Sequence, residues 1–234
     1  MKTNCIAIIP ARGGSKRIPR KNIKDFFGKP LIAYTIQVAL ESELFDKVIV
    51  STDDEEIAQI AIHYGAEVPV MRPKSLSDDM TGTQAVIDFT IDFLDKHYKR
   101  YDYICTLYAT APLLKVNYLK EAYNKIKNSS AKYCFSATSM PFPIQRSFKI
   151  NKLGRCKMFT PEYYSTRSQD LEESYHDAGQ FYWENRNILS EKVIFGEDSI
   201  PIILPRYLVQ DIDTLEDWKQ AEILYEIIHK KNNG

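Results

Sequence analysis

Short apolar runs alternate with segments of helical periodicity over the first 140 residues of the chain. The runs are rich in isoleucine and valine and are bounded by polar residues, as expected for strands buried on both faces. The segments between them repeat apolar residues every three or four positions, as amphipathic helices do. We therefore predict strands at residues 5–9, 47–51, 68–71, 103–107 and 133–138, and helices at 30–43, 53–64, 83–96 and 119–126.

Strands that alternate with helices favour a mainly parallel sheet, because each helix carries the chain back across the sheet. The alternation stops at residues 140–177, which contain three prolines and many aromatic residues but no helical pattern. Strands are predicted again at 181–183 and 202–204, and a last helix starts near Asp213 or Thr214, where Asp213 has the spacing of a capping box with Glu216. The predicted fold is one α/β domain, residues 1–234: a three-layer sandwich with a mostly parallel Rossmann-like sheet and a small inserted β-rich subdomain at 140–177 for dimerisation or substrate binding.

The composition excludes several classes of protein. Lys and Arg number 31, as do Asp and Glu, and zero net charge disfavours a nucleic-acid-binding protein. No apolar run approaches the roughly 18 residues of a membrane-spanning helix, and no signal-peptide pattern follows Lys2. The four cysteines lack CxxC and zinc-site spacing, which favours buried, reduced thiols. We expect a cytoplasmic protein without membrane association.

The loop at residues 10–22 follows the first predicted strand and is strongly basic. In α/β sheets, ligands bind at the carboxyl ends of the strands. Gly13 and Gly14 allow the backbone to turn and to present N–H groups to an anion, and Ser15 adds a hydroxyl donor. The loop lacks the Walker and GxGxxG patterns, which disfavours a dinucleotide-binding oxidoreductase. Although a solvated basic loop is the simple alternative, triphosphate binding is favoured by the glycines and by five cations: Arg12, Lys16, Arg17, Arg20 and Lys21.

Together with five further motifs, this loop resembles the CMP-nonulosonate (sialic acid type) cytidylyltransferase family. The motifs occur in order over nearly the whole chain, at residues 28–31, 51–53, 72–73, 110–113 and 211–214. The resemblance implies that the protein transfers CMP from CTP to an acidic nine-carbon sugar, with release of pyrophosphate. It also implies that the triphosphate and nucleoside contact Arg12, Gly13, Gly14, Ser15, Lys16, Lys21 and Asn22, and that the base lies near Arg72 and Thr83.

Asp211 and Asp213 are two residues apart, so in an extended chain their side chains point to the same side. Two such carboxylates repel each other unless a cation joins them, and Mg²⁺ favours one or two carboxylates together with phosphate oxygens. The family resemblance implies a magnesium site at Asp211 and Asp213, and catalytic roles for both together with Arg12 and Lys21. The alternative for Asp213 is a helix N-cap.

The sugar-binding motifs depart from those of the sialic acid enzymes. Tyr108 stands where those enzymes have glutamine, Leu114 where they have arginine, and residues 175–183 replace their Arg-Pro-Asn-Gly run. Both departures resemble the branch of the family that acts on pseudaminic acid. Because polar contacts to a sugar determine specificity sharply, the departures predict a sugar other than sialic acid. Candidate sugar-binding residues are Tyr108, Gln145, Arg146, Arg167, His176, Asp177 and Gln180.

Other functions stay open from the sequence. The sugar could be N-acetylneuraminic, legionaminic or octulosonic acid, and a non-catalytic nucleotide-binding regulator could share the fold. The resemblance also implies a homodimer that pairs through the inserted segment.

Overall fold

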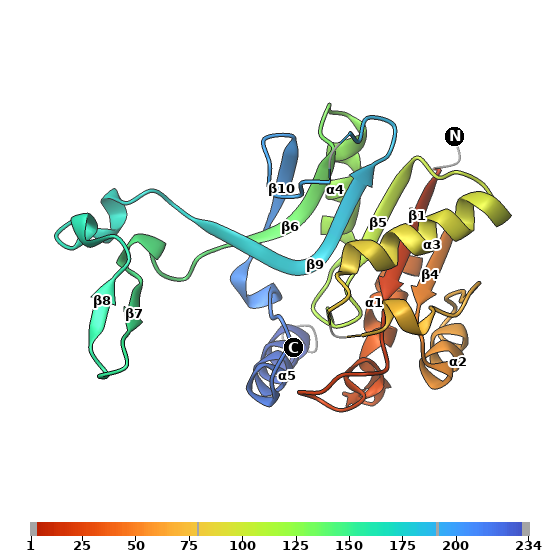
Figure 1. Cartoon of the computed structure of the whole chain (residues 1–234), viewed down its shortest axis with the longest axis horizontal. Coiled ribbons are helices and arrows are strands. Elements are labelled where there is room, and N and C mark those ends of the chain that lie inside the picture. Colours follow the sequence, from red (N-terminus) through yellow and green to blue (C-terminus); the bar gives the residue numbers. More distant parts are fainter. Residues whose placement is uncertain (1–3, 79, 191, 231–234) are drawn as a thin grey trace.

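The computed structural model describes residues 4–78, 80–190 and 192–230. Its centre is a six-stranded sheet with the order β10-β6-β9-β5-β1-β4 (Figure 1). Strand β9 runs antiparallel to its neighbours β5 and β6, and the other paired strands of this sheet are parallel. The strands are β1 (Cys5–Pro10), β4 (Lys47–Ser51), β5 (Tyr103–Leu107), β6 (Tyr133–Ser139), β9 (Tyr175–Asn185) and β10 (Ser199–Leu204).

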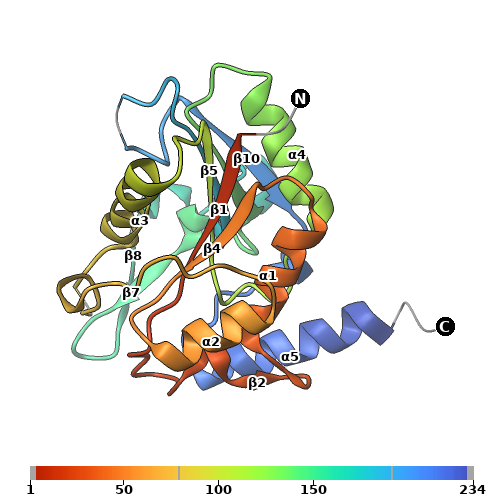
Figure 2. The same ribbon diagram turned by 90° about the vertical axis from the view of Figure 1, so that its right-hand side faces the viewer.

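Helices cover both faces of this sheet, so the predicted three-layer α/β sandwich is confirmed (Figure 2). Along β1, Ala7 and Ile9 pack with helices α1 (Leu31–Glu41) and α4 (Val116–Lys127), whereas Ile6 and Ile8 pack with α3 (Thr83–His97). This alternation follows from the two-residue period of a strand and explains why β1 is apolar throughout. The helices are α1 (Leu31–Glu41), α2 (Glu55–His63), α3 (Thr83–His97), α4 (Val116–Lys127) and α5 (Leu215–Lys230). None of the described helices is long and apolar enough to cross a membrane.

Two predicted strands differ from the structure. Residues 68–71 form no strand: the chain makes a single bridge from Glu67 to Ile49 in β4 and then leaves the sheet. Pro69, which has no N–H to donate, follows two residues later and prevents the ladder from continuing. The strand predicted at 181–183 lies in the second half of the much longer β9, whose first half carries polar residues.

Residues 140–174 form an arm that extends away from the sheet (Figure 1). Its only regular strands among the described residues are β7 (Phe148–Ile150) and β8 (Cys156–Met158), which pair as a short antiparallel hairpin. The prediction of a β-rich insertion thus holds only for this hairpin, and residues 175–177 already belong to β9. Cys156 is exposed in the arm, contrary to the prediction of a buried thiol, while the other three cysteines are buried. Several large apolar side chains of the arm are also exposed: Phe142, Phe148, Ile150, Leu153, Phe159 and Tyr164.

Helix α5 begins with a capping box at Thr214, which was one of the two predicted starts of this helix, but the box lies one residue after the predicted pair. Thr214 Oγ1 accepts a hydrogen bond from the Asp217 amide at 3.2 Å, and Asp217 Oδ2 accepts one from the Thr214 amide at 2.7 Å. The predicted pair of Asp213 and Glu216 is therefore wrong, because Thr214 takes the N-cap role. Trp218 of α5 packs with Phe26 of the small hairpin β2 (Asp25–Phe26) and β3 (Lys29–Pro30), which holds this helix beside the end of the basic loop.

Candidate active site

The basic loop lines a cavity of about 490 Å³ at the carboxyl end of β1. Seven of the nine predicted nucleotide-binding residues line it, and these are Arg12, Ser15, Lys16, Lys21, Asn22, Arg72 and Thr83. The other lining residues are Pro10, Arg17, Thr81, Val86, Tyr108, Ala109, Thr110 and Asp213. The structure thus brings together residues from the basic loop, from the segment at 72–86, from the end of β5 and from the segment before α5.

The two glycines of the loop form its turn rather than its lining. A Cβ atom on Gly13 would lie 2.6 Å from Asp54 Oδ2, so any larger residue would force the Asp54 side chain to move from its position. A Cβ on Gly14 would meet open space. The turn is fixed by the Ser15 amide, which donates to the Gly13 carbonyl at 3.0 Å, and by the Asn22 side chain, which donates to the Arg12 carbonyl at 3.0 Å. This hydrogen bond from Asn22, whose side chain is buried, holds the two ends of the loop together.

Four of the five loop cations line the cavity, and Arg20 does not. Arg20 has a left-handed backbone with φ of 56° and forms ion pairs with Asp54 and Glu56. Asp54 also caps α2 by accepting from the Ile57 amide at 3.0 Å, and its hydrogen bond with Arg20 lowers the pKa of its carboxyl group. Arg20 therefore fastens the loop to α2, whereas Arg12, Lys16, Arg17 and Lys21 line the cavity.

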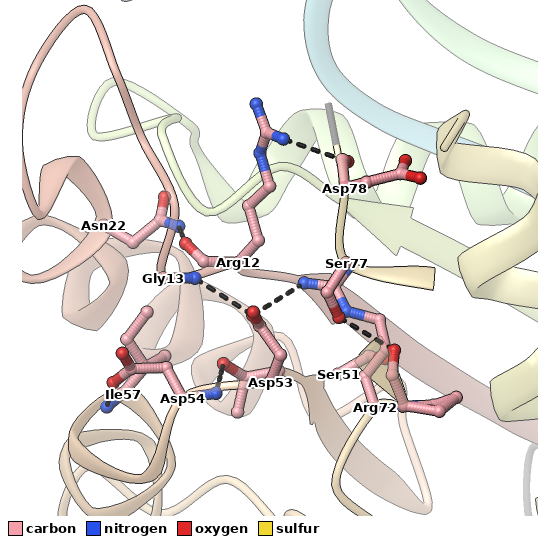
Figure 3. Close-up of polar contacts among 12 residues, drawn as sticks. Arg12, Gly13, Asn22, Ser51, Asp53, Asp54, Ile57, Arg72, Ser77 and Asp78 are labelled. Carbon is pink, nitrogen blue, oxygen red and sulfur yellow. Dashed lines mark hydrogen bonds and ion pairs between the residues drawn. The ribbon is translucent and has the colours of Figure 1, made fainter. Parts of the chain in front are cut away.

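Arg72 is almost fully buried at the edge of this cavity. Its Nη2 lies 3.3 Å from Asp53 Oδ1, and the same oxygen accepts a hydrogen bond from the Gly13 amide at 3.0 Å (Figure 3). Burial lowers the pKa of Arg72, and the Asp53 carboxylate opposes this effect. Asp53 was not predicted as a site residue, although it belongs to the 51–53 motif that follows β4.

Asp211 and Asp213 flank Ile212, which is fully buried in the core, so both carboxylates lie on the opposite side, as predicted. Asp213 Oδ1 lies 2.9 Å from Arg17 Nη2 and 3.3 Å from Lys21 Nζ. Lys21 also donates to the Ile212 carbonyl. Desolvation and the neighbouring Asp213 carboxylate raise the pKa of Asp211. This repulsion is what a cation between the two carboxylates would relieve.

The carboxylates of Asp211 and Asp213 alone supply only part of the ligands that a magnesium ion needs. No group of three or more His, Cys, Asp or Glu side chains that could hold a metal is found among the described residues. Two carboxylates are nevertheless the set that Mg²⁺ uses when substrate phosphates and water supply its other ligands. The donor set therefore fits Mg²⁺ beside a bound triphosphate.

A second pocket of about 430 Å³ adjoins the first and shares Asp213 with it. The predicted sugar-binding residues His176 and Asp177 line it, together with Ala178, Val209, Gln210, Asp211 and Asp217. His176 comes from the start of β9, where its Nδ1 lies 2.8 Å from the Asp177 carbonyl oxygen. The residue shared by the two pockets is thus one of the two candidate metal ligands.

Tyr108 lines the first cavity, on the side of β5. Its ring lies 5.3 Å from the ring of Tyr182, whose hydroxyl donates to Asp177. Burial raises the pKa of Tyr182, and its phenol therefore stays protonated as a donor. These contacts connect Tyr108 in the first cavity to Asp177 in the second pocket.

Four predicted sugar-binding residues lie elsewhere. Gln180 is buried within the sheet, and its amide donates to the Leu208 carbonyl, which is a structural contact. The other three belong to the arm and bond within it: Gln145 to the Glu172 carbonyl, Arg146 to the Thr166 carbonyl and Arg167 to the Asp170 carboxylate. None of the four lines either pocket.

Two residues in or beside the cavity were not predicted as site residues: Thr81 lines it, and Asp53 supports it from behind. Arg17 was predicted only as one of the loop cations, and it also lines the cavity. The signal for Arg17 was its place among the loop cations, but no pattern indicated that it pairs with Asp213. Thr81 comes from a loop without a regular pattern, so the sequence carried no signal for it.

Comparison with known proteins agrees with this geometry. The family model described as cytidylyltransferase matches residues 6–230. Pseudaminic acid cytidylyltransferase from Campylobacter jejuni is 50% identical over 98% of this chain and 99% of its own. CMP-N,N'-diacetyllegionaminic acid synthase from Legionella pneumophila is 34% identical over 95% of this chain and 96% of its own. The solved structure of CMP:2-keto-3-deoxy-manno-octonic acid synthetase complexed with CTP has the same fold, with a TM-score of 0.65 at 18% identity over 94% of this chain and 98% of its own. The chain belongs to the cytidylyltransferase family.

Proposed function

We propose that this enzyme transfers CMP from CTP to pseudaminic acid, giving CMP-pseudaminic acid and pyrophosphate. The observation that carries the proposal is the pair of adjoining pockets that meet at Asp213, the first lined by five cations and the second by carboxylates. Such a pair suits a triphosphate on one side and the attacking sugar on the other. The 50% identity to the Campylobacter jejuni pseudaminic acid enzyme over nearly its whole length supports this choice of sugar.

The loop cations act by binding and neutralising the triphosphate. Arg12, Lys16, Arg17 and Lys21 line the cavity, and guanidinium groups suit phosphate oxygens. As negative charge develops on the leaving pyrophosphate, cations already held in place stabilise it without reorganisation. Holding the sugar hydroxyl in line with the α-phosphate accounts for the rest of the rate increase.

The ion pairs of Asp213 change when the triphosphate binds. In the free protein, Asp213 is ion-paired with both Arg17 and Lys21. Phosphate oxygens compete for the same two cations, which leaves the Asp213 carboxylate without its partners beside Asp211. We propose that the two carboxylates then hold Mg²⁺, which polarises the α-phosphate when bound.

The sugar is proposed to bind in the second pocket, beside His176, and to extend toward Tyr108 in the adjoining first cavity. This pocket contains four carboxylates, and no Lys or Arg is among its described lining residues. An acidic sugar needs a cation there, and the free arm carries Arg146 and Arg167. We propose a homodimer in which the arm of one protomer reaches the sugar pocket of the other and buries the exposed aromatic residues. We expect the enzyme to act in the cytoplasm.

The test of the proposed function is pyrophosphate release with CTP and a panel of nonulosonates. Pseudaminic, legionaminic, N-acetylneuraminic and octulosonic acids are compared at one concentration of magnesium, and CTP is compared with ATP, GTP and UTP. We expect turnover with CTP and the highest specificity constant with pseudaminic acid. Equal turnover with another triphosphate would contradict the choice of nucleotide. A higher specificity constant for another sugar would contradict only the choice of acceptor, and binding without turnover of any sugar would favour a regulator.

A further inference from the structure

One carboxylate oxygen connects two parts of the nucleotide cavity that are far apart in the sequence. Asp53 Oδ1 accepts from the Gly13 amide in the basic loop and from Arg72 Nη2 in the segment after α2. Figure 3 shows both contacts converging on this atom. Asp53 does not itself line the cavity. Its carboxylate therefore fixes the loop and the arginine relative to each other from behind.

Among the described contacts, the Asp53 carboxylate is the group that binds the guanidinium of Arg72. Only 4% of its side chain is exposed, and its Nε has no hydrogen-bond partner. Its backbone is anchored beside Asp53, because its amide donates to the Thr52 carbonyl at 2.8 Å. Buried donors are normally satisfied, so an unpaired Nε in a residue that lines the cavity indicates an acceptor on the ligand.

The chemistry of a guanidinium group suits one pyrimidine better than the other. Arginine only donates hydrogen bonds. Cytosine presents two neighbouring acceptors, O2 and N3, whereas uracil presents an N3–H donor at the second position. An arginine that is held rigidly toward the base therefore favours cytosine, and an arginine that can turn away does not.

We propose that Asp53 is a positioning residue that determines the preference for CTP over UTP, by holding Arg72 toward the base while it holds Gly13 of the phosphate-binding loop. This inference rests on the proposed use of CTP. It goes beyond that function by assigning base selectivity to a residue behind the cavity. The Asp53 carboxylate acts through its charge on Arg72 and through its acceptor oxygen on Gly13.

The substitution Asp53→Asn separates these two effects, because asparagine keeps an acceptor oxygen for the Gly13 amide and loses the charge that holds Arg72. Hydrogen bonds to charged groups contribute enough for an effect of roughly tenfold on affinity. We therefore expect the Kd for CTP to rise about tenfold, with a smaller change for UTP. The matched control is Asp46→Asn, which removes an ion pair with Lys99 at 2.7 Å outside the cavity lining and should leave both Kd values unchanged.

Binding of CTP and UTP is measured by titration calorimetry, which needs no sugar. Failure of the proposed reaction therefore appears in the turnover assay and does not affect this readout. Unchanged preference for CTP in Asp53→Asn, or equal binding of CTP and UTP by the wild type, would overturn the inference. A folded state is checked by circular dichroism.

A second variant set keeps the inference testable if Asp53→Asn unfolds. Arg72→Met removes the arginine, and Asp53→Asn/Arg72→Met leaves no buried unpaired charge, so the double variant should fold. If Asp53 sets selectivity through Arg72, the double variant has the same ratio of CTP to UTP affinity as Arg72→Met alone. A further loss of preference in the double variant would show that Asp53 acts by another route.

Discussion

Replacing Asp213 by asparagine should abolish most of the activity while leaving the fold intact. Asp213 is ion-paired, but its side chain is 41% exposed and that of Arg17 is 65% exposed. Exposed ion pairs contribute roughly 0–1 kcal/mol to the free energy of unfolding. For a chain of this size that corresponds to a fall in Tm of less than about 4 °C.

The expected effect of Asp213→Asn on catalysis is much larger than its effect on stability. Asp213 lies where the two pockets meet and is one of only two proposed metal ligands. Loss of a charged group that stabilises the transition state typically lowers kcat by roughly 10²–10³-fold. We expect a loss of at least about a hundredfold, because asparagine keeps the shape but not the charge.

The assay is pyrophosphate release at saturating CTP over a series of magnesium concentrations, with thermal unfolding followed by circular dichroism. The matched control is Asp198→Asn, because Asp198 is 61% exposed, pairs with Lys132 at 2.6 Å and lies outside both pockets. Near-normal turnover of Asp213→Asn at saturating magnesium would refute the metal-binding role and leave Asp213 as an ion-pair partner of the loop.

Four further outcomes are expected. Asp211→Asn should raise Tm in metal-free buffer, because the raised pKa of Asp211 means that the wild type loses stability as pH rises through that pKa. With CTP present, the variant should not show the rise in Tm that we expect magnesium to give the wild type, as measured by scanning fluorimetry. Gln180→Leu should lower the free energy of unfolding in urea by about 1–3 kcal/mol, since the Leu208 carbonyl loses its donor. Pseudaminic acid should exceed N-acetylneuraminic acid in kcat/KM by at least about a hundredfold, and Tyr108→Gln should reduce that ratio. Light scattering should show a dimer at micromolar concentration, and a monomer alone would contradict the proposed role of the arm.

The parallel half of the fold could be predicted because its strands are apolar on both faces. Ile6 and Ile8 face one layer of helices while Ala7 and Ile9 face the other, and this leaves a continuous apolar run in the sequence. The start of β9 left no such run. Tyr175, His176 and Asp177 are exposed there, and the strand is held by antiparallel pairing with β6, which is distant in sequence.

The same distinction applies to the site. The phosphate-binding loop could be predicted because its glycines and cations are neighbours in sequence. Arg17 and Arg20 are chemically identical and three residues apart, yet Arg17 lines the cavity and Arg20 binds α2, because the left-handed backbone at Arg20 changes the direction of the chain. The role of Asp53 depends on Gly13, a residue 40 positions away, and no local pattern could reveal it.

The position of β9 has a consequence for how the protein folds. β9 lies between β5 and β6, so these two strands, which follow one another in the chain, do not pair with each other. A growing chain can pair β1, β4 and β5 early, but β6 has no neighbour until the ribosome has made β9. Such long-range pairing is slow, because a long loop must close first. A chain that stops before β9 therefore exposes the edges of β5 and β6, and unpaired edges of this kind promote aggregation.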